Sequence, residues 1–168
     1  SLFVLEIITG FFSGSMGLVA DSLDMLADAI VYSLSIYAVG HIASKKKRVA
    51  KISGYFQMAL ALFGIIEVIR RFLGFEEVPV FQTMIVISFF ALIGNAISLY
   101  LLQKSKSKEA HMQASMIFTS NDVIVNIGVI VAGILVYFTN SKFPDLIIGS
   151  IVFILVAKGA IRILKLSK

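Results

Sequence analysis

Cysteine is absent from the 168 residues of this chain, and charged residues make up only 15% of it. Without cysteine, neither disulfide bonds nor thiolate metal sites can form, and the redox compartment cannot be read from the sequence. Soluble domains carry about 25% charged residues, so the low charge excludes an ordinary soluble fold. Hydrophobic residues account for 58%, and the mean hydropathy is +0.95. The composition therefore indicates an integral membrane protein.

Apolar runs divide the chain into six segments joined by short turns. They predict spans at about 2–12, 16–41, 51–72, 79–103, 109–138 and 144–165. A helix needs about 20 residues to cross a bilayer, so 2–12 reaches only about halfway; either its first turns are missing or it starts within the interface. The six spans use up the whole chain and leave no room for a soluble domain. The predicted fold is an all-α membrane protein with six transmembrane helices, in a cell or inner membrane.

Basic residues predict the orientation. One side of the predicted bundle, made by the loops 45–51 and 104–108 and by the C-terminal end, holds most of the lysines and arginines. The other side holds only Arg70, Arg71 and Lys142. By the positive-inside rule the first side, with the C-terminus, is cytoplasmic. The lysine run can also contact anionic membrane lipid. Because the net charge of +5 lies at helix ends, we expect no nucleic-acid partner.

Three aspartates lie within an apolar stretch of the second span. Asp21, Asp24 and Asp28 follow the spacing i, i+3, i+7, which places them on one face of a helix. A carboxylate near the bilayer centre costs several kcal/mol. This face must therefore meet water, a counter-charge or a metal ion.

A fourth aspartate is expected at the same depth. Asp24 and Asp28 lie about 10 to 14 residues from the outer end of the second span, and Asp122 lies about 13 residues from the cytoplasmic end of the fifth span. At 1.5 Å per residue all three therefore fall near the midplane. Secondary transporters place their binding sites at this level.

Four stretches of the chain resemble the cation diffusion facilitators, also called the cation efflux family. They are SGSMGLVADSLDMLAD (Ser13 to Asp28), ALIGNAISLYLL (Ala91 to Leu102), AHMQASMIFTSNDVIVNIGVIVAG (Ala110 to Gly133) and FPDLIIGSIVFILVAKGAIRILK (Phe143 to Lys165). The resemblance implies a six-span metal/proton antiporter that works as a homodimer. The transported ion would be a divalent metal of the Zn, Mn, Fe, Co or Cd class, and no other cofactor is expected.

The resemblance also implies a metal site. Asp24 and Asp28 match the family's ligand pair in span two, and Asp122 matches the second ligand of span five. The first ligand of span five is usually His, Asp or Asn, but Phe118 stands there, so one ligand position is lost. Asp21 is common in the family without being one of its four ligands; it could hold a helix end, lie on the proton path or bind the metal as an additional ligand. Two further departures are the segment KKKRVAKISGY before span three and the absence of a cytoplasmic C-terminal domain, which mark the chain as a divergent member.

Other polar residues lie near the predicted site. Interhelical hydrogen bonding is their expected role, although any of them, or water, could replace the lost ligand; they are Asn95, Ser115, Thr119, Asn121 and Asn126. Glu67 is expected to pair with Arg70 and Arg71, one turn away. Glu6 has no obvious partner and could relay protons.

Three functions fit these residues. The first is efflux of a divalent cation driven by proton entry, because buried, mutually repelling carboxylates bind protons that a divalent ion must displace. The second is a degenerate member of the family that binds metal without transporting it, with Phe118 marking the loss. The third is a Mg²⁺-dependent intramembrane prenyltransferase, since the three aspartates also spell D-x-x-D-x-x-x-D. That enzyme would need a second acidic cluster and basic residues at the same level, and the sequence offers only Asp122.

Overall fold

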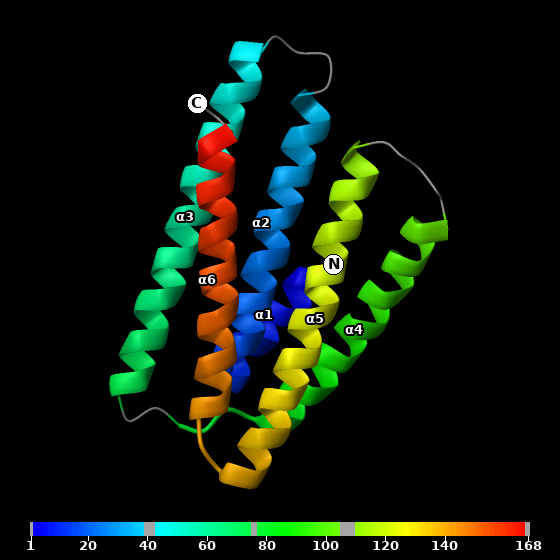
Figure 1. The fold of residues 1–168 in the computed structure, drawn as a ribbon. Helices are drawn as coiled ribbons and strands as arrows, with labels where there is room; N and C mark the ends of the chain where they lie inside the picture. The colour runs from blue at the N-terminus through cyan, green and yellow to red at the C-terminus, as the bar shows by residue number, and fades with distance from the viewer. Residues whose placement is uncertain (1, 39–42, 75–76, 105–109, 167–168) are drawn as a thin grey trace.

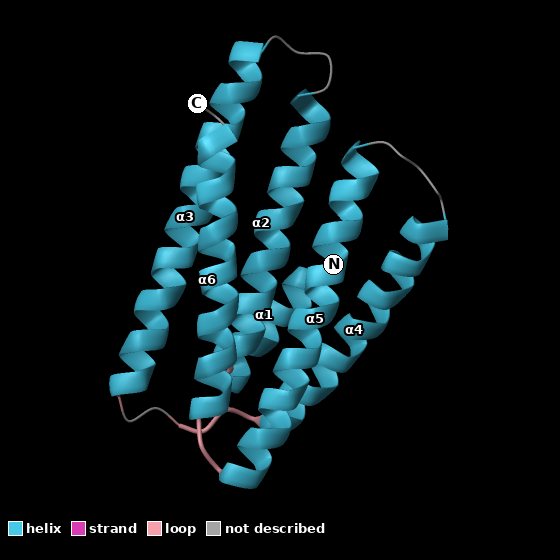
Figure 2. Cartoon of the chain, viewed as in Figure 1, coloured by secondary structure: helices cyan, strands magenta, loops and turns pink. Residues whose placement is uncertain are grey.

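The structure is a computed structural model that describes residues 2–38, 43–74, 77–104 and 110–166. These residues form six helices and no strand (Figures 1 and 2). The helices are α1 (Leu2–Ser13), α2 (Met16–Ala38), α3 (Ala43–Leu73), α4 (Phe81–Lys104), α5 (Ala110–Thr139) and α6 (Phe143–Leu166). The all-helical fold class is confirmed, and each helix falls on one of the predicted spans.

Helix α2 is central to the bundle and contacts each of the other five helices. Figure 1 shows α3 beside α6 and α4 beside α5, with α2 between these pairs. Helices α2 and α5 run in opposite directions, because α2 begins at the end of the bundle where α5 finishes. An acidic face on α2 can therefore meet side chains from several helices.

Among the described residues, four helices contain stretches that are long and apolar enough to cross a membrane. These are 50–73 in α3, 81–104 in α4, 119–139 in α5 and 143–165 in α6. Helix α1 is shorter, with 12 residues, and α2 carries the three aspartates that lower its hydropathy. Large apolar side chains cover the outside of the bundle, among them Phe63, Ile66 and Ile124, each more than 60% exposed. Such a surface suits lipid rather than water.

Two helix starts differ from the sequence prediction. The segment Lys45–Arg48 was expected to be a loop but belongs to α3, which begins at Ala43. Lysine and arginine are good helix formers, so their charge marks the end of an apolar span without ending the helix. Pro79 was expected to begin the fourth helix but precedes it, since the Met84 N–H donates to Val80 O and makes Val80 the cap of α4.

A tight turn at residues 13–15 joins α1 to α2. Gly14 has a φ of 70°, a left-handed conformation that glycine adopts at little cost. The Gly14 N–H donates to Phe11 O at 3.3 Å and the Ser15 N–H to Gly10 O at 3.0 Å. This pair of bonds is a Schellman motif, which ends α1 and reverses the chain into α2.

Candidate functional site

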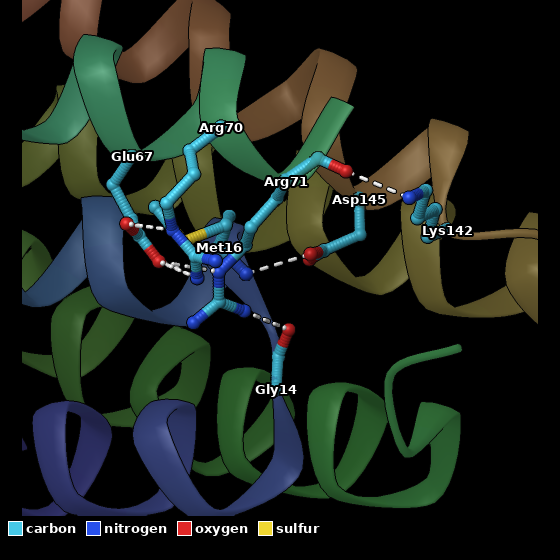
Figure 3. A network of polar contacts seen from close by, with 7 residues as sticks. All are labelled: Gly14, Met16, Glu67, Arg70, Arg71, Lys142 and Asp145. Atoms are coloured by element: carbon cyan, nitrogen blue, oxygen red, sulfur yellow. Dashed lines mark hydrogen bonds and ion pairs between the residues drawn. The ribbon is translucent and has the colours of Figure 1, made fainter. Parts of the chain in front are cut away.

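A carboxylate from α6 holds the first turn of α2. Asp145 is buried and accepts a hydrogen bond from Met16 N at 2.6 Å (Figure 3). It also accepts from Ser15 Oγ at 2.6 Å and from Gly17 N at 2.9 Å. The first N–H groups of a helix have no partner within the helix, and its positive end attracts a carboxylate. Ser15 Oγ also accepts from Leu18 N at 3.2 Å. The start of α2, and with it the aspartate face, is therefore fixed to α6.

Basic side chains join α3 to the same end of the bundle. Arg71 donates to Gly14 O at 2.8 Å and to Glu67 Oε1 at 2.9 Å, and Arg70 donates to Glu67 at 2.8 Å. The ion pair predicted for Glu67 is thus confirmed. Lys142 donates to Arg71 O at 2.7 Å and also to Gly74 O. Figure 3 shows Arg71 between Glu67 and the turn that leads into α2. These hydrogen bonds join the C-terminal ends of α1 and α3 to the start of α6.

Aspartates of α2 and α5 lie in the same interior region, as the sequence predicts. Asp24 and Asp122 are each 8% exposed and Asp28 is half-buried. Asp122 is close enough to Asp24 and Asp28 for electrostatic interaction, and Asp24 interacts in the same way with Asp28. Asp122 Oδ1 is buried without a hydrogen-bond partner in the described part of the chain.

These aspartates do not form a closed coordination shell in this conformation. Within residues 2–38, 43–74, 77–104 and 110–166, no three His, Cys, Asp or Glu side chains converge closely enough to hold a metal ion. The assignment of Asp24, Asp28 and Asp122 as metal ligands therefore stays a prediction. All three offer carboxylate oxygen, which suits a divalent cation.

A second set of polar groups lies beside the three aspartates. Asp21 is fully buried, and its Oδ2 accepts a hydrogen bond from the side-chain amide of Asn126. Asn126 Oδ1 in turn accepts from Asn95 Nδ2 at 3.2 Å. The interhelical hydrogen bonding predicted for Asn95 and Asn126 is confirmed. Glu6 is fully buried on α1 and interacts electrostatically with Asp21 and Asp122.

The remaining candidates are less well placed or less well described. Thr119 is half-buried and Asn121 is exposed. The side chains of Ser115 and Phe118 lie outside the described residues, so the predicted loss of a ligand at Phe118 stays a prediction.

Asp145 is the contributor that the sequence did not reveal. An aspartate directly after a proline in the first turn of a helix is expected to stabilise its own helix. Nothing in the local pattern indicates that it accepts hydrogen bonds from residues about 130 positions away. Only the packing of α6 against α2 reveals this role.

The fold and the candidate site together identify the chain as a helical membrane domain with carboxyl groups buried where α2 meets α5. The profile of the cation efflux transmembrane domain matches residues 1–167, and the chain belongs to this family. The family resemblance seen in the four sequence stretches is therefore confirmed. Its members are transporters rather than enzymes, so the prenyltransferase interpretation is wrong.

Named bacterial proteins are similar to the chain. The zinc transporter ZitB of Pectobacterium atrosepticum is 30% identical over 177 residues, covering 96% of this chain and 54% of its own length. The metal cation efflux system protein CzcD of Cupriavidus metallidurans is 25% identical over 154 residues, covering 84% of this chain and 48% of its own. The cadmium, cobalt and zinc/H⁺–K⁺ antiporter of Bacillus subtilis is 25% identical over 177 residues, covering 96% and 56%. The chain spans about half the length of these relatives.

Proposed function

We propose that this domain exports a divalent metal cation across the membrane in exchange for protons, with the metal bound by Asp24, Asp28 and Asp122. The observation that carries the proposal is the group of buried carboxyl groups without a basic partner where α2 meets α5. No basic side chain in the described part of the chain is near enough to these three aspartates to neutralise them. Ionised carboxyl groups inside a membrane domain are costly unless cations, protons included, bind there.

Competition between metal and protons supplies the coupling. A divalent ion binds carboxylates only in their ionised form, so its arrival releases protons from them. Protons that enter from the opposite side displace the metal again. If the site opens to the two sides of the membrane in turn, this competition becomes antiport. Alternating access is part of the proposal.

The donor set suggests which ions are carried. Asp24, Asp28 and Asp122 supply only oxygen, and Thr119 or water would add further oxygen. The relatives named above carry zinc, cadmium and cobalt in their names, which supports the Zn, Mn, Fe, Co or Cd class for this chain. Affinity at such a site rises from Mn²⁺ toward Zn²⁺, while the absence of imidazole weakens the preference for Zn²⁺.

The proposal extends to the surroundings of the domain. We expect the basic segments near 45–51 and 104–108, with the C-terminus, to lie in the cytoplasm, so that transport runs outward from there. We expect the domain to work as a homodimer surrounded by membrane lipid.

Transport by reconstituted protein tests the proposal. Proteoliposomes that contain a metal-sensitive dye are given Zn²⁺, Mn²⁺ or Cd²⁺ with and without a pH gradient. Uptake that requires the gradient and exceeds that of protein-free vesicles is the expected result. Metal binding by calorimetry without any gradient-driven uptake would instead support the second candidate, a metal-binding domain that has lost transport.

A further inference from the structure

A second polar layer lies next to the three predicted metal ligands, displaced along the bundle. Asp21 precedes Asp24 by three residues on α2, and Asn126 follows Asp122 by four residues on α5, which are displacements of about 5 to 6 Å along each helix. Because α2 and α5 run in opposite directions, both displacements point toward the end where α2 begins (Figure 1). The layer is therefore separate from the ligand level and closer to the predicted outer side.

Glu6 is the unexplained member of this layer. Its side chain is fully buried, and neither carboxylate oxygen has a hydrogen-bond partner among the described residues. Asp21 is also fully buried, and its Oδ1 lacks a partner in the same part of the chain. A buried polar group without a partner costs free energy, and two carboxyl groups cost more. These oxygen atoms are therefore candidates to bind a positive charge.

The charges around Glu6 are all negative. Helix α1 packs against α2 and α4. Glu6 interacts electrostatically with Asp21 of α2, which itself interacts with Asp24. Glu6 also interacts with Asp122 of α5. Helix α4 holds no acidic residue, and its one basic residue, Lys104, is at the helix end. Within the described residues, nothing that packs on Glu6 supplies a cation.

The two asparagines give the layer a fixed direction. Asn95 donates to Asn126, and Asn126 donates to Asp21 Oδ2. This series of bonds holds the Asn126 amide with its N–H toward Asp21. Three oxygens then remain to face a positive charge, namely both oxygens of Glu6 and Oδ1 of Asp21.

From this arrangement we infer that Glu6 and Asp21 form a binding site for the counter-ion of transport, separate from the metal ligands and oriented by Asn126. The ion is a hard monovalent cation held by carboxyl oxygens, either a proton shared between the two groups or an alkali-metal ion. The inference rests on the proposed antiport and names where its second ion binds. Two carboxylates are a poor shell for a divalent transition metal but suit a single positive charge.

The position of the layer explains how the two ions oppose each other. Glu6 and Asp21 both interact electrostatically with Asp122. A cation between Glu6 and Asp21 makes the potential at Asp122 less negative and so weakens metal binding there. By reciprocity, bound metal weakens the counter-ion's binding. This negative coupling between the two sites adds to the direct competition between metal and protons at the three ligands.

The test compares Glu6→Gln with Glu77→Gln, the same chemical change at an exposed glutamate outside the layer. Zn²⁺ affinity of each detergent-solubilised protein is measured by calorimetry, in one series at increasing proton concentration and in another at increasing K⁺. Wild type and Glu77→Gln should lose about tenfold in affinity along the series that contains the true counter-ion. Glu6→Gln should keep the affinity measured at low counter-ion concentration and lose the share of that dependence that Glu6 and Asp21 add to direct competition at the three metal ligands. The series in which wild type and Glu6→Gln differ identifies the ion.

Two companion variants separate this role from a structural one. Glu6→Asp keeps a carboxyl group and should retain the dependence, and Asp21→Asn should lose it as Glu6→Gln does. A Glu6→Gln protein with the full wild-type dependence would overturn the inference. Such a result would mean that Glu6 is a neutral acid with a structural role only, which an amide can replace. Simultaneous loss of metal binding in Glu6→Gln and Asp21→Asn would also overturn it, by making them part of the metal site. Since these readouts need no transport, failure of the reconstituted protein to move metal counts against the proposed function alone.

Discussion

At the scale of single residues, the three predicted ligands make the most direct claim. Asp24→Ala, Asp28→Ala and Asp122→Ala should each reduce metal uptake into proteoliposomes by at least about tenfold, because each removes one of three charged donors that replace the ion's hydration. The variants should still fold, since each loses a buried charge rather than packing volume. Gel filtration and far-UV circular dichroism check the folding. Glu77→Ala is the control, and full transport by Asp24→Ala or Asp28→Ala would refute the assignment.

Phe118 makes a separate claim about selectivity. Phe118→His should add an imidazole to the oxygen donors and raise Zn²⁺ affinity relative to Mn²⁺, because mixed nitrogen and oxygen tetrahedra suit Zn²⁺. Competitive binding of the two ions to the parent and to the variant measures the change. The fifth-span ligand set would have to be redrawn around another residue if the parent already preferred Zn²⁺ strongly and the histidine changed nothing.

At the scale of helices, the attachment of α2 to α6 decides how the aspartate face is held. Asp145→Ala would leave Ser15 Oγ and the N–H groups of Met16 and Gly17 without their acceptor. We expect the free energy of unfolding in detergent to fall by about 1–3 kcal/mol, the cost of leaving buried donors unpaired. Ser150→Ala is the matched control on the same helix, since it removes only a local bond to Leu146 O. Equal unfolding curves for the two variants would show that α2 does not depend on this cap.

The helices also show what a sequence pattern can predict. Local pairings were readable, as for Glu67 with Arg70 and Arg71, because they depend only on spacing within one helix. The start of α3 was missed because the sequence prediction placed the membrane boundary and the helix boundary together at the charged run. The helix continues through the run, so the two boundaries do not coincide. Asp145 could not be predicted, since its partners are brought to it by tertiary packing.

At the scale of the whole molecule, the candidate site depends on α2 meeting α1, α4 and α5 in one interior region. Family motifs predicted that Asp24, Asp28 and Asp122 would come together. They did not predict that Glu6 would be fully buried beside Asp21, because a lone glutamate in an apolar segment carries no information on what packs against it. The inward-facing polar groups thus come from four helices, while the outer surface of the bundle is apolar.

This shared interior predicts that metal binding by the whole domain releases protons and weakens as the pH falls. As the proton concentration rises, more of the clustered carboxyl groups are protonated, and the metal must displace more protons to bind. The affinity should therefore decrease from mildly alkaline to mildly acid conditions. Calorimetry in buffers of different ionisation enthalpy counts the released protons at each pH, because the heat taken up by the buffer scales with that number. The Asp122→Ala protein should release fewer protons per bound metal than the parent, if it still binds metal, since one competing carboxyl group is gone. An affinity that stays constant across this pH range, with no buffer-dependent heat, would mean that metal and protons do not compete in this interior. The coupling step of the proposed antiport would then be wrong even if the domain carries metal.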